Sequence, residues 1–180
     1  KGQIHIIIGL DSSGSMKGDK IGTCKKAGMA LAYKATQEKD KVGLIVFGSD
    51  VKESIAPTDD LTALVKKMVN IKAGKETDFA KTIEKSVEMF KIENVTRHLI
   101  LITDALPTVG DDPVKKTLNA VEFAQNHKIT ISVVGINLDE KGRDLAQKMI
   151  EVGRGKLYLV RNLEELDRIV LEDYYSIGER

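Results

Sequence analysis

The chain has 180 residues, a length typical of one domain with its own hydrophobic core. Its residues are 42% hydrophobic and 31% charged, and a net charge of +1 gives no electrostatic reason to expect nucleic acid or an anionic membrane as a ligand. No apolar run approaches the ~18 residues of a transmembrane helix. A single cysteine, Cys24, excludes an internal disulfide and favours a reducing, cytoplasmic location.

Strand patterns and helix patterns alternate along the chain. Short runs rich in Ile, Val and Leu predict buried strands, and apolar residues at helical spacing predict amphipathic helices. In chain order we expect a strand at 4–10, a helix at 19–37, strands at 42–47 and 51–55, helices at 61–71 and 78–90, a strand at 99–103, a helix at 113–126, a strand at 129–136, a helix at 140–152, a strand at 156–160 and a helix at 162–174.

This alternation is typical of an α/β fold with a mostly parallel sheet, because parallel strands need crossover helices. The four main strands are apolar along nearly their whole length, so helices should cover both faces of the sheet. We expect a Rossmann-like, doubly wound sheet of six strands in the order 3-2-1-4-5-6, with 51–55 as an antiparallel edge strand. Residues 1–180 form one domain in this interpretation, and the start at Lys1 suggests that it is excised from a longer protein.

The stretch Asp11-Ser12-Ser13-Gly14-Ser15-Met16 directly follows the first predicted strand. In open α/β sheets, ligands bind outside the carboxyl ends of the strands, where this stretch should lie. A carboxylate and two hydroxyls at alternate positions are hard oxygen donors, which suit Mg²⁺, Mn²⁺ or Ca²⁺ better than zinc. The alternative is a turn in which Asp11 caps a helix and the serines are solvated.

Two more oxygen-bearing side chains fall at the same edge: Thr77 in a loop before a helix, and Asp104 after the strand at 99–103. With the Asp-x-Ser-x-Ser stretch, they resemble the von Willebrand factor A domain, and the resemblance covers nearly the whole chain. In that family these positions form the metal-ion-dependent adhesion site. The resemblance implies a metal site made by Asp11, Ser13, Ser15, Thr77 and Asp104.

Mg²⁺ or Mn²⁺ is expected ahead of Ca²⁺ at this site. One departure from the family is Gly9, which replaces a large apolar residue in the first strand and would permit a close approach of a neighbouring backbone. Cys24 shares a helix face with apolar residues and should be buried and unreactive.

The resemblance implies a divalent-metal-dependent protein-interaction module without catalytic activity, whose protein partner supplies an Asp or Glu carboxylate to the metal. Lys17, Lys20 and Lys75 could steer an acidic partner surface toward the ion. The motif looks most like those of intracellular prokaryotic members of the magnesium-chelatase D and MoxR-associated types, which implies an AAA+ ATPase as partner.

Two other hypotheses stay open. One is a Mg²⁺-dependent phosphoryl-transfer or phosphatase-like enzyme at the same sheet edge, which would need a nucleophile or base beside the metal. No lysine or further acid at fixed spacing supports it. The other is a metal-free structural domain in which these residues only hold turns.

Overall fold

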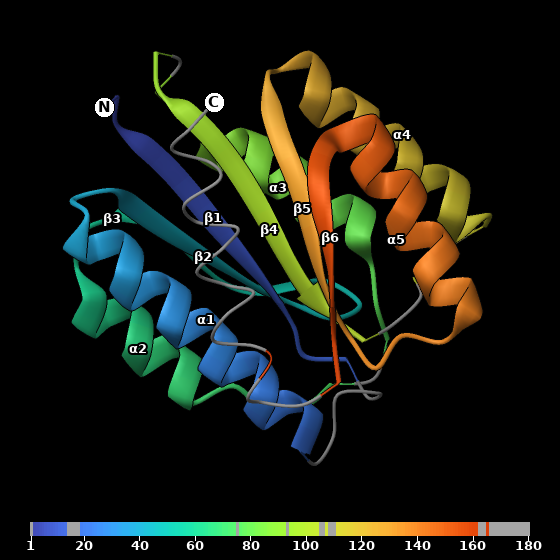
Figure 1. The fold of residues 1–180 in the computed structure, drawn as a ribbon, viewed down its shortest axis with the longest axis horizontal. Helices are drawn as coiled ribbons and strands as arrows, with labels where there is room; N and C mark the ends of the chain where they lie inside the picture. The colour runs from blue at the N-terminus through green and yellow to red at the C-terminus, as the bar shows by residue number, and fades with distance from the viewer. Residues whose placement is uncertain are drawn as a thin grey trace.

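The computed structural model describes residues 2–13, 19–74, 76–92, 94–104, 107, 111–161 and 165 (Figure 1). Six strands form one sheet in the order β3-β2-β1-β4-β5-β6. The elements are β1 (Ile4–Asp11), α1 (Asp19–Gln37), β2 (Lys41–Phe47), β3 (Val51–Thr58), α2 (Leu61–Val69), α3 (Phe79–Met89), β4 (Thr96–Thr103), α4 (Pro113–Asn126), β5 (Ile129–Ile136), α5 (Glu140–Gly153) and β6 (Arg154–Val160).

The predicted topology is confirmed. The neighbouring pairs β1–β2, β1–β4, β4–β5 and β5–β6 are parallel, and β3 pairs with β2 in the antiparallel direction. Each parallel strand therefore ends at the same edge of the sheet, toward the lower part of Figure 1. Residues just after β1 and β4, which are adjacent in the sheet, are brought together at this edge although they are distant in sequence.

Several element boundaries differ from those predicted. The edge strand β3 continues to Thr58 instead of ending near 55, and it includes Pro57. An edge strand tolerates proline, and the register shifts between Val42 and Leu44 leave Pro57 outside the ladder pairs. Helix α2 ends at Val69, and β4 and β6 begin three and two residues earlier than predicted. The helix predicted at 162–174 lies outside the described residues.

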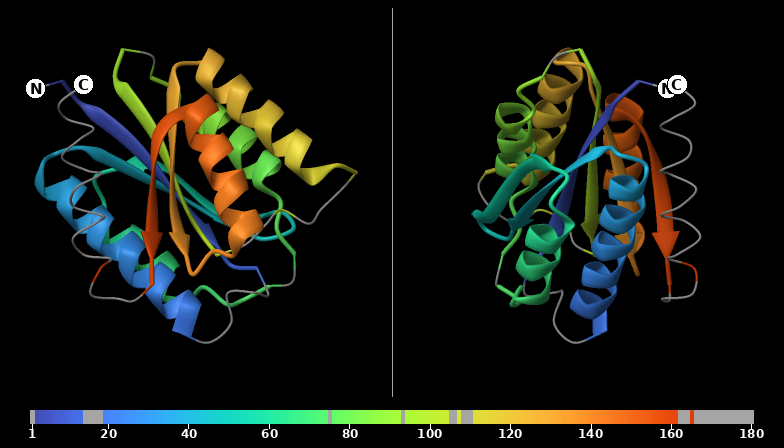
Figure 2. Two further views of the ribbon diagram at one scale, coloured as in Figure 1. Left: turned by 45° about the vertical axis from the view of Figure 1, so that its right-hand side comes forward. Right: turned by 90° about the vertical axis from the view of Figure 1, so that its left-hand side faces the viewer.

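The sheet has a hydrophobic core on each face. Along β1, Ile4, Ile6, Ile8 and Leu10 pack in the cluster that includes α1 and α2, whereas Ile7 packs in the cluster of α3, α4 and α5. The two views of Figure 2 show α1 and α2 side by side. Successive strand side chains point to opposite faces, so a strand buried on both sides must be apolar throughout.

Gly9 corrects one prediction. A Cβ added to Gly9 would lie 2.7 Å from the Leu101 Cδ2 atom, with Phe47 and Thr82 side chains next nearest. The space that the missing side chain leaves in the β1 row is therefore filled by the side chain of Leu101 from β4, and the three nearest atoms all belong to side chains and not to a backbone. A larger residue would overpack this part of the core.

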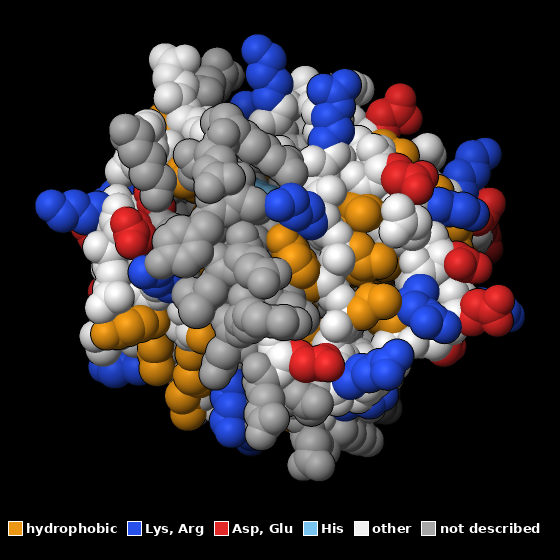
Figure 3. All heavy atoms as spheres, viewed as in Figure 1, with side chains coloured by type: hydrophobic (Ala, Val, Ile, Leu, Met, Phe, Trp, Pro, Cys, Tyr) orange, Lys and Arg blue, Asp and Glu red, His pale blue; other side chains and the backbone are white. Residues whose placement is uncertain are grey.

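Within the described part of the chain, no helix has the length and apolar character needed to cross a bilayer. On the face shown in Figure 3, acidic and basic side chains are interspersed over the part that is described. This distribution agrees with the low net charge of the chain.

Candidate metal site at the carboxyl edge of the sheet

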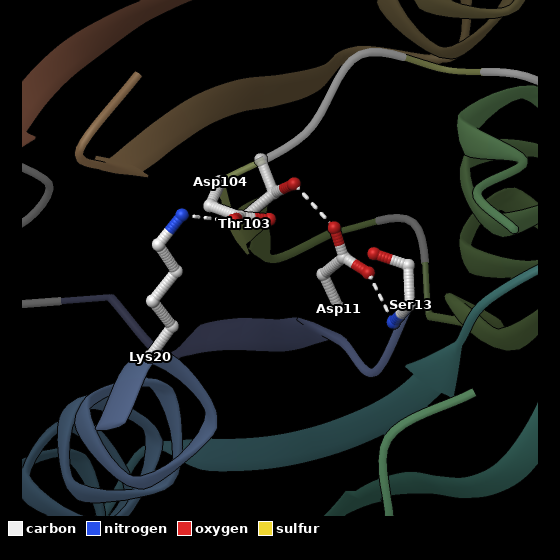
Figure 4. Close-up of polar contacts among 5 residues, drawn as sticks. All are labelled: Asp11, Ser13, Lys20, Thr103 and Asp104. Atoms are coloured by element: carbon white, nitrogen blue, oxygen red, sulfur yellow. Dashed lines mark hydrogen bonds and ion pairs between the residues drawn. The ribbon is translucent and has the colours of Figure 1, made fainter. Parts of the chain in front are cut away.

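Asp11 is the last residue of β1, and its side chain is held from two sides (Figure 4). The backbone amide of Ser13 donates a hydrogen bond of 2.7 Å to Oδ1 of Asp11, and the hydroxyl of Thr103 donates one of 2.5 Å to Oδ2. Asp11, Ser13 and Thr103 are all buried. The carboxylate is therefore fixed in orientation before any ligand arrives.

Burial raises the pKa of the Asp11 carboxyl above its ordinary value, because the charged form is poorly solvated there. The hydrogen bonds from Thr103 and Ser13 act in the opposite direction, and the negative charge of Asp104 raises the pKa further. Two carboxylates thus lie close enough to repel each other inside the protein. Such a pair is favourable only with positive charge beside it.

Asp104 follows β4 directly, one residue after Thr103. Its side chain is only 1% exposed and forms an ion pair of 2.9 Å with the ammonium of Lys20, in the first turn of α1 (Figure 4). The contact of Lys20 with a candidate metal ligand was not predicted from the sequence, and steering of a partner by Lys20 stays a prediction. Lys17 and Lys75, which were expected to steer the partner with it, lie outside the described residues.

Thr77 lies in the loop before α3 and is buried. Two backbone hydrogen bonds hold this loop against the ends of β1 and β2: Gly74 donates to the Ser12 carbonyl, and Asp78 donates to the Gly48 carbonyl at 2.6 Å. The side chain of Asp78 also caps α3 by accepting from the Lys81 amide. The loop of Thr77 is therefore joined to the same edge as Asp11.

Of the five residues in the predicted ligand set, the structure describes Asp11, Ser13, Thr77 and Asp104, and all four lie in segments at the carboxyl edge. Hydrogen bonding links Asp11 with Ser13, and electrostatic interaction links Asp11 with Asp104. Ser15 lies outside the described residues.

The turn interpretation accounts for part of these contacts, because the hydrogen bond from the Ser13 amide to the Asp11 carboxylate is that of an Asx turn. Asp11 belongs to β1, and within the described residues α1 begins at Asp19. Ser13 is buried instead of solvated. Ser12 has the structural role, since its amide and hydroxyl both donate to the Phe47 carbonyl, at 2.7 and 2.9 Å, and so fasten the loop to β2.

The donor set suits a hard divalent cation. Two carboxylates, from Asp11 and Asp104, balance the charge of such an ion, and the hydroxyls of Ser13 and Thr77 are neutral oxygen donors. No three His, Cys, Asp or Glu side chains cluster within the described ranges, so a site rich in soft or acidic ligands is not formed by them. The residues fit Mg²⁺ or Mn²⁺ better than zinc.

Three contacts were not anticipated from the sequence: those of Thr103, Ser12 and Lys20. The contact of Thr103 could have been predicted, because an apolar strand ending in Thr-Asp puts a hydroxyl beside the carboxylate at the end of the neighbouring strand. The Lys20–Asp104 pair joins residues 84 positions apart and had no comparable signal.

Cys24 is buried under the site, on α1, with its Sγ atom 3.6 Å from the Ile102 carbonyl and 4.0 Å from that of Asp11. Burial, followed by the negative charge of Asp11, raises the pKa of the thiol well above its ordinary value. We therefore expect a thiol reagent to label the native domain at least about 1000-fold more slowly than the urea-unfolded chain, since reaction requires opening of the core. Labelling at comparable rates would contradict this placement of α1.

Curated relatives align with most of the chain. It is 28% identical over 145 residues to the uncharacterized protein MJ0910 of Methanocaldococcus jannaschii, covering 76% of this chain and 79% of that protein. It is 25% identical over 166 residues to the uncharacterized protein sll0103 of Synechocystis, covering 90% of this chain and 39% of that protein. The chain thus spans well under half of the second relative.

Solved structures share the fold. BatB from Bacteroides thetaiotaomicron superposes with a TM-score of 0.82 at 21% identity, covering 98% of this chain and 100% of the other. The pilus adhesin SpaC from Lactobacillus rhamnosus GG gives 0.84 at 14%, covering 98% and 30%. The SpRpn10 VWA domain gives 0.77 at 14%, covering 96% and 95%.

The family assignment comes from the sequence profile of the von Willebrand factor type A domain, which matches residues 6–106. This range is more than half of the chain and contains all five residues of the predicted ligand set. The observed strand order and the superposed structures agree with it. The chain belongs to the von Willebrand factor type A domain family.

Proposed function

We propose that this domain is a protein-interaction module that binds its partner through a divalent metal at the carboxyl edge of the sheet. The observation that carries the proposal is the pair of buried carboxylates, Asp11 and Asp104, at the ends of adjacent strands. The intact Asp-x-Ser-x-Ser stretch and the loop of Thr77 support it. Asp11, Ser13, Ser15, Thr77 and Asp104 would hold the metal, with Mg²⁺ or Mn²⁺ as the ion.

The metal, when bound, would supply an electrophilic coordination position for an incoming oxygen ligand. This chain's own residues determine which ligand suits it. Asp11 and Asp104 neutralise the charge of a divalent ion, while neutral hydroxyls fill the other protein positions and leave the ion attractive to an anion. The partner should therefore supply an Asp or Glu carboxylate, held by a charge-assisted contact at the centre of the interface.

One of the superposed structures, SpaC, supports an interaction role, since it is a pilus adhesin. On the resemblance of the motif, we place this chain with the magnesium-chelatase D and MoxR-associated members, with an AAA+ ATPase as the partner class and the cytoplasm as its location. These finer assignments are proposals that rest on the motif.

One observation favours the alternative of Mg²⁺-dependent phosphoryl transfer. Lys20 provides a cation beside Asp104, as phosphoryl-transfer sites require. Both oxygens of Asp11, however, accept hydrogen bonds, which makes the carboxylate a poor nucleophile. We expect p-nitrophenyl phosphate with Mg²⁺ to be hydrolysed no faster than in buffer. Hydrolysis that is lost in Asp11→Asn would establish an enzyme instead.

The adhesion function can be tested by replacing Thr77 with Val, which removes a hydroxyl while nearly keeping the side-chain volume. We expect affinity for Mg²⁺ and Mn²⁺, measured by calorimetry, to fall roughly tenfold or more, because a direct or supporting ligand is lost. Thr62→Val, on the exposed side of α2, is the matched control and should bind metal as the wild type does.

Partner binding should follow the same pattern. Immobilised wild-type domain should retain a protein from an extract of the source cells in Mg²⁺ and release it in EDTA, and Thr77→Val should retain less of it. Equal retention in Mg²⁺, in EDTA and by Thr77→Val would place partner binding on another surface and refute the proposed function.

A further inference from the structure

The ion pair between Lys20 and Asp104 differs from the other ion pairs of the described residues. The acid in each of those pairs is at least 39% exposed, whereas the Asp104 side chain is 1% exposed. Exposed ion pairs are screened by water and contribute little to the free energy of folding. A buried carboxylate, in contrast, is costly without a positive charge beside it. Lys20 therefore has a specific electrostatic task at this site.

The position of the ammonium defines that task. It lies 2.9 Å from Oδ2 of Asp104, and Thr103, the residue before Asp104, donates a hydrogen bond to the Asp11 carboxylate at the end of the adjacent strand β1. Asp104 is also one of the residues that would hold the metal. Lys20 thus neutralises the charge of Asp104, one of the two carboxylates that would balance a divalent cation (Figure 4).

The lysine and a metal cannot both satisfy this site favourably. Two carboxylates balance one divalent ion, and an ammonium kept beside them would add an unbalanced positive charge that repels the metal. The Lys20 side chain is 39% exposed and stands in the first turn of α1, so its flexible stem gives the ammonium a route into solvent. Its displacement would require no rearrangement of the sheet.

We propose that Lys20 is an internal counter-cation that competes with the metal: it pairs with Asp104 in the metal-free domain and leaves when a divalent ion binds. Lys20 then determines the metal concentration at which the domain becomes competent for its partner. This inference rests on the proposed metal site and adds to it a residue outside the family's ligand set.

The test compares metal affinities of the wild type, Lys20→Met and Lys20→Arg, measured by calorimetry with Mg²⁺ and with Mn²⁺. Lys20→Met keeps the aliphatic stem and removes the competing charge, so its affinity should rise about fivefold or more. Lys20→Arg keeps a charge that pairs well with a carboxylate, so its affinity should be equal to or below that of the wild type. Lys25→Met is the matched control, because it removes a lysine of the same helix whose ammonium contacts the Val69 carbonyl, and it should leave the affinity unchanged.

Thermal unfolding provides the second measurement. In EDTA, Lys20→Met should unfold at a lower temperature than the wild type, because the ion pair between Lys20 and Asp104 is lost. Saturating metal should remove most of this difference, since the bound ion replaces the lysine. If Lys20→Met does not fold in EDTA, its metal-induced folding, followed by circular dichroism, gives the apparent affinity for the same comparison.

The outcomes separate this inference from the proposed function. If the wild type binds metal but Lys20→Met binds it no more tightly, the competition is refuted while the metal site stands. An equal gain in affinity in Lys25→Met would also refute it, since net charge alone would then explain the effect. If neither the wild type nor Lys20→Met binds Mg²⁺ or Mn²⁺ in the calorimetric titrations, the proposed function fails, and Lys20 is a permanent counter-charge.

Discussion

Replacing Asp11 with Asn is expected to weaken binding of Mg²⁺ and Mn²⁺ by more than about 100-fold while the domain stays folded. The amide has nearly the shape of the carboxylate. Its oxygen can still accept from the Ser13 amide, and its NH₂ group can donate to the Thr103 hydroxyl. The substitution therefore removes the negative charge at the site and little else. Calorimetry on the purified domain measures the loss directly.

The same variant should be at least as stable as the wild type without metal. The pKa of Asp11 is raised in the folded state, chiefly by burial, so the ionised carboxylate lowers the free energy of unfolding at neutral pH. The loss of stability caused by the ionised Asp11 is complete above its folded-state pKa. It disappears as the pH falls toward the pKa of Asp11 in the unfolded chain, near 3.8. The stability advantage of Asp11→Asn in EDTA should therefore shrink in acid, as urea denaturation at several pH values would show.

Asp50→Asn is the matched control for Asp11→Asn. Asp50 is well exposed and its ion pair with Lys81 is long, at 3.8 Å, so the variant should match the wild type in metal affinity and stability. Wild-type metal affinity in Asp11→Asn would show that the ion binds elsewhere. A large loss of stability in Asp11→Asn would show instead that the charge of Asp11 is needed for folding.

Replacing Phe47 in the core beneath the site is expected to cause a large loss of stability. Phe47, at the end of β2, is fully buried and packs edge to face against Phe79 of α3, with ring centroids 5.6 Å apart. Phe47→Ala should lower the free energy of unfolding by about 3–5 kcal/mol, because apolar surface is lost and a cavity remains. Urea denaturation followed by circular dichroism measures this change.

Phe123→Ala is the control for Phe47→Ala. Phe123 is 46% exposed on α4, where its ring contacts His127, so its removal should cost less than about 1 kcal/mol. Similar losses in the two variants would contradict the packing described between the sheet and α3. Where Phe47→Ala still folds, metal binding should persist, since Ser12 bonds to the Phe47 backbone carbonyl and not to its ring.

Element order and topology could be predicted from the sequence because they depend on local pattern. Continuous apolar runs such as 99–102 are needed only where both faces of a strand are covered, and the alternation with helices leaves few topologies. Boundaries were less predictable. The length of β3 depends on its pairing with β2, which carries Thr58 into the sheet opposite Val42, and no local pattern encodes that pairing.

The resemblance to the von Willebrand factor A domain implied the candidate ligand set, and sheet geometry accounts for part of it, because parallel strands bring the residues that follow them to one edge. Asp11 and Asp104 needed only the strand ends to be located. The family profile and fold support this choice of edge, whereas metal binding itself remains a prediction.

The charge environment of that edge was decided by the tertiary structure alone. Lys20 appeared in the sequence to be a solvent-exposed lysine near a loop, and only the packing of α1 beside β4 brings its ammonium to a buried carboxylate 84 residues away. Thr103 likewise reaches Asp11 only because β1 and β4 are neighbours. Local pattern specifies which atoms a site contains, but Coulomb energies and hydrogen bonds depend on distance and burial, which exist only once the chain has folded.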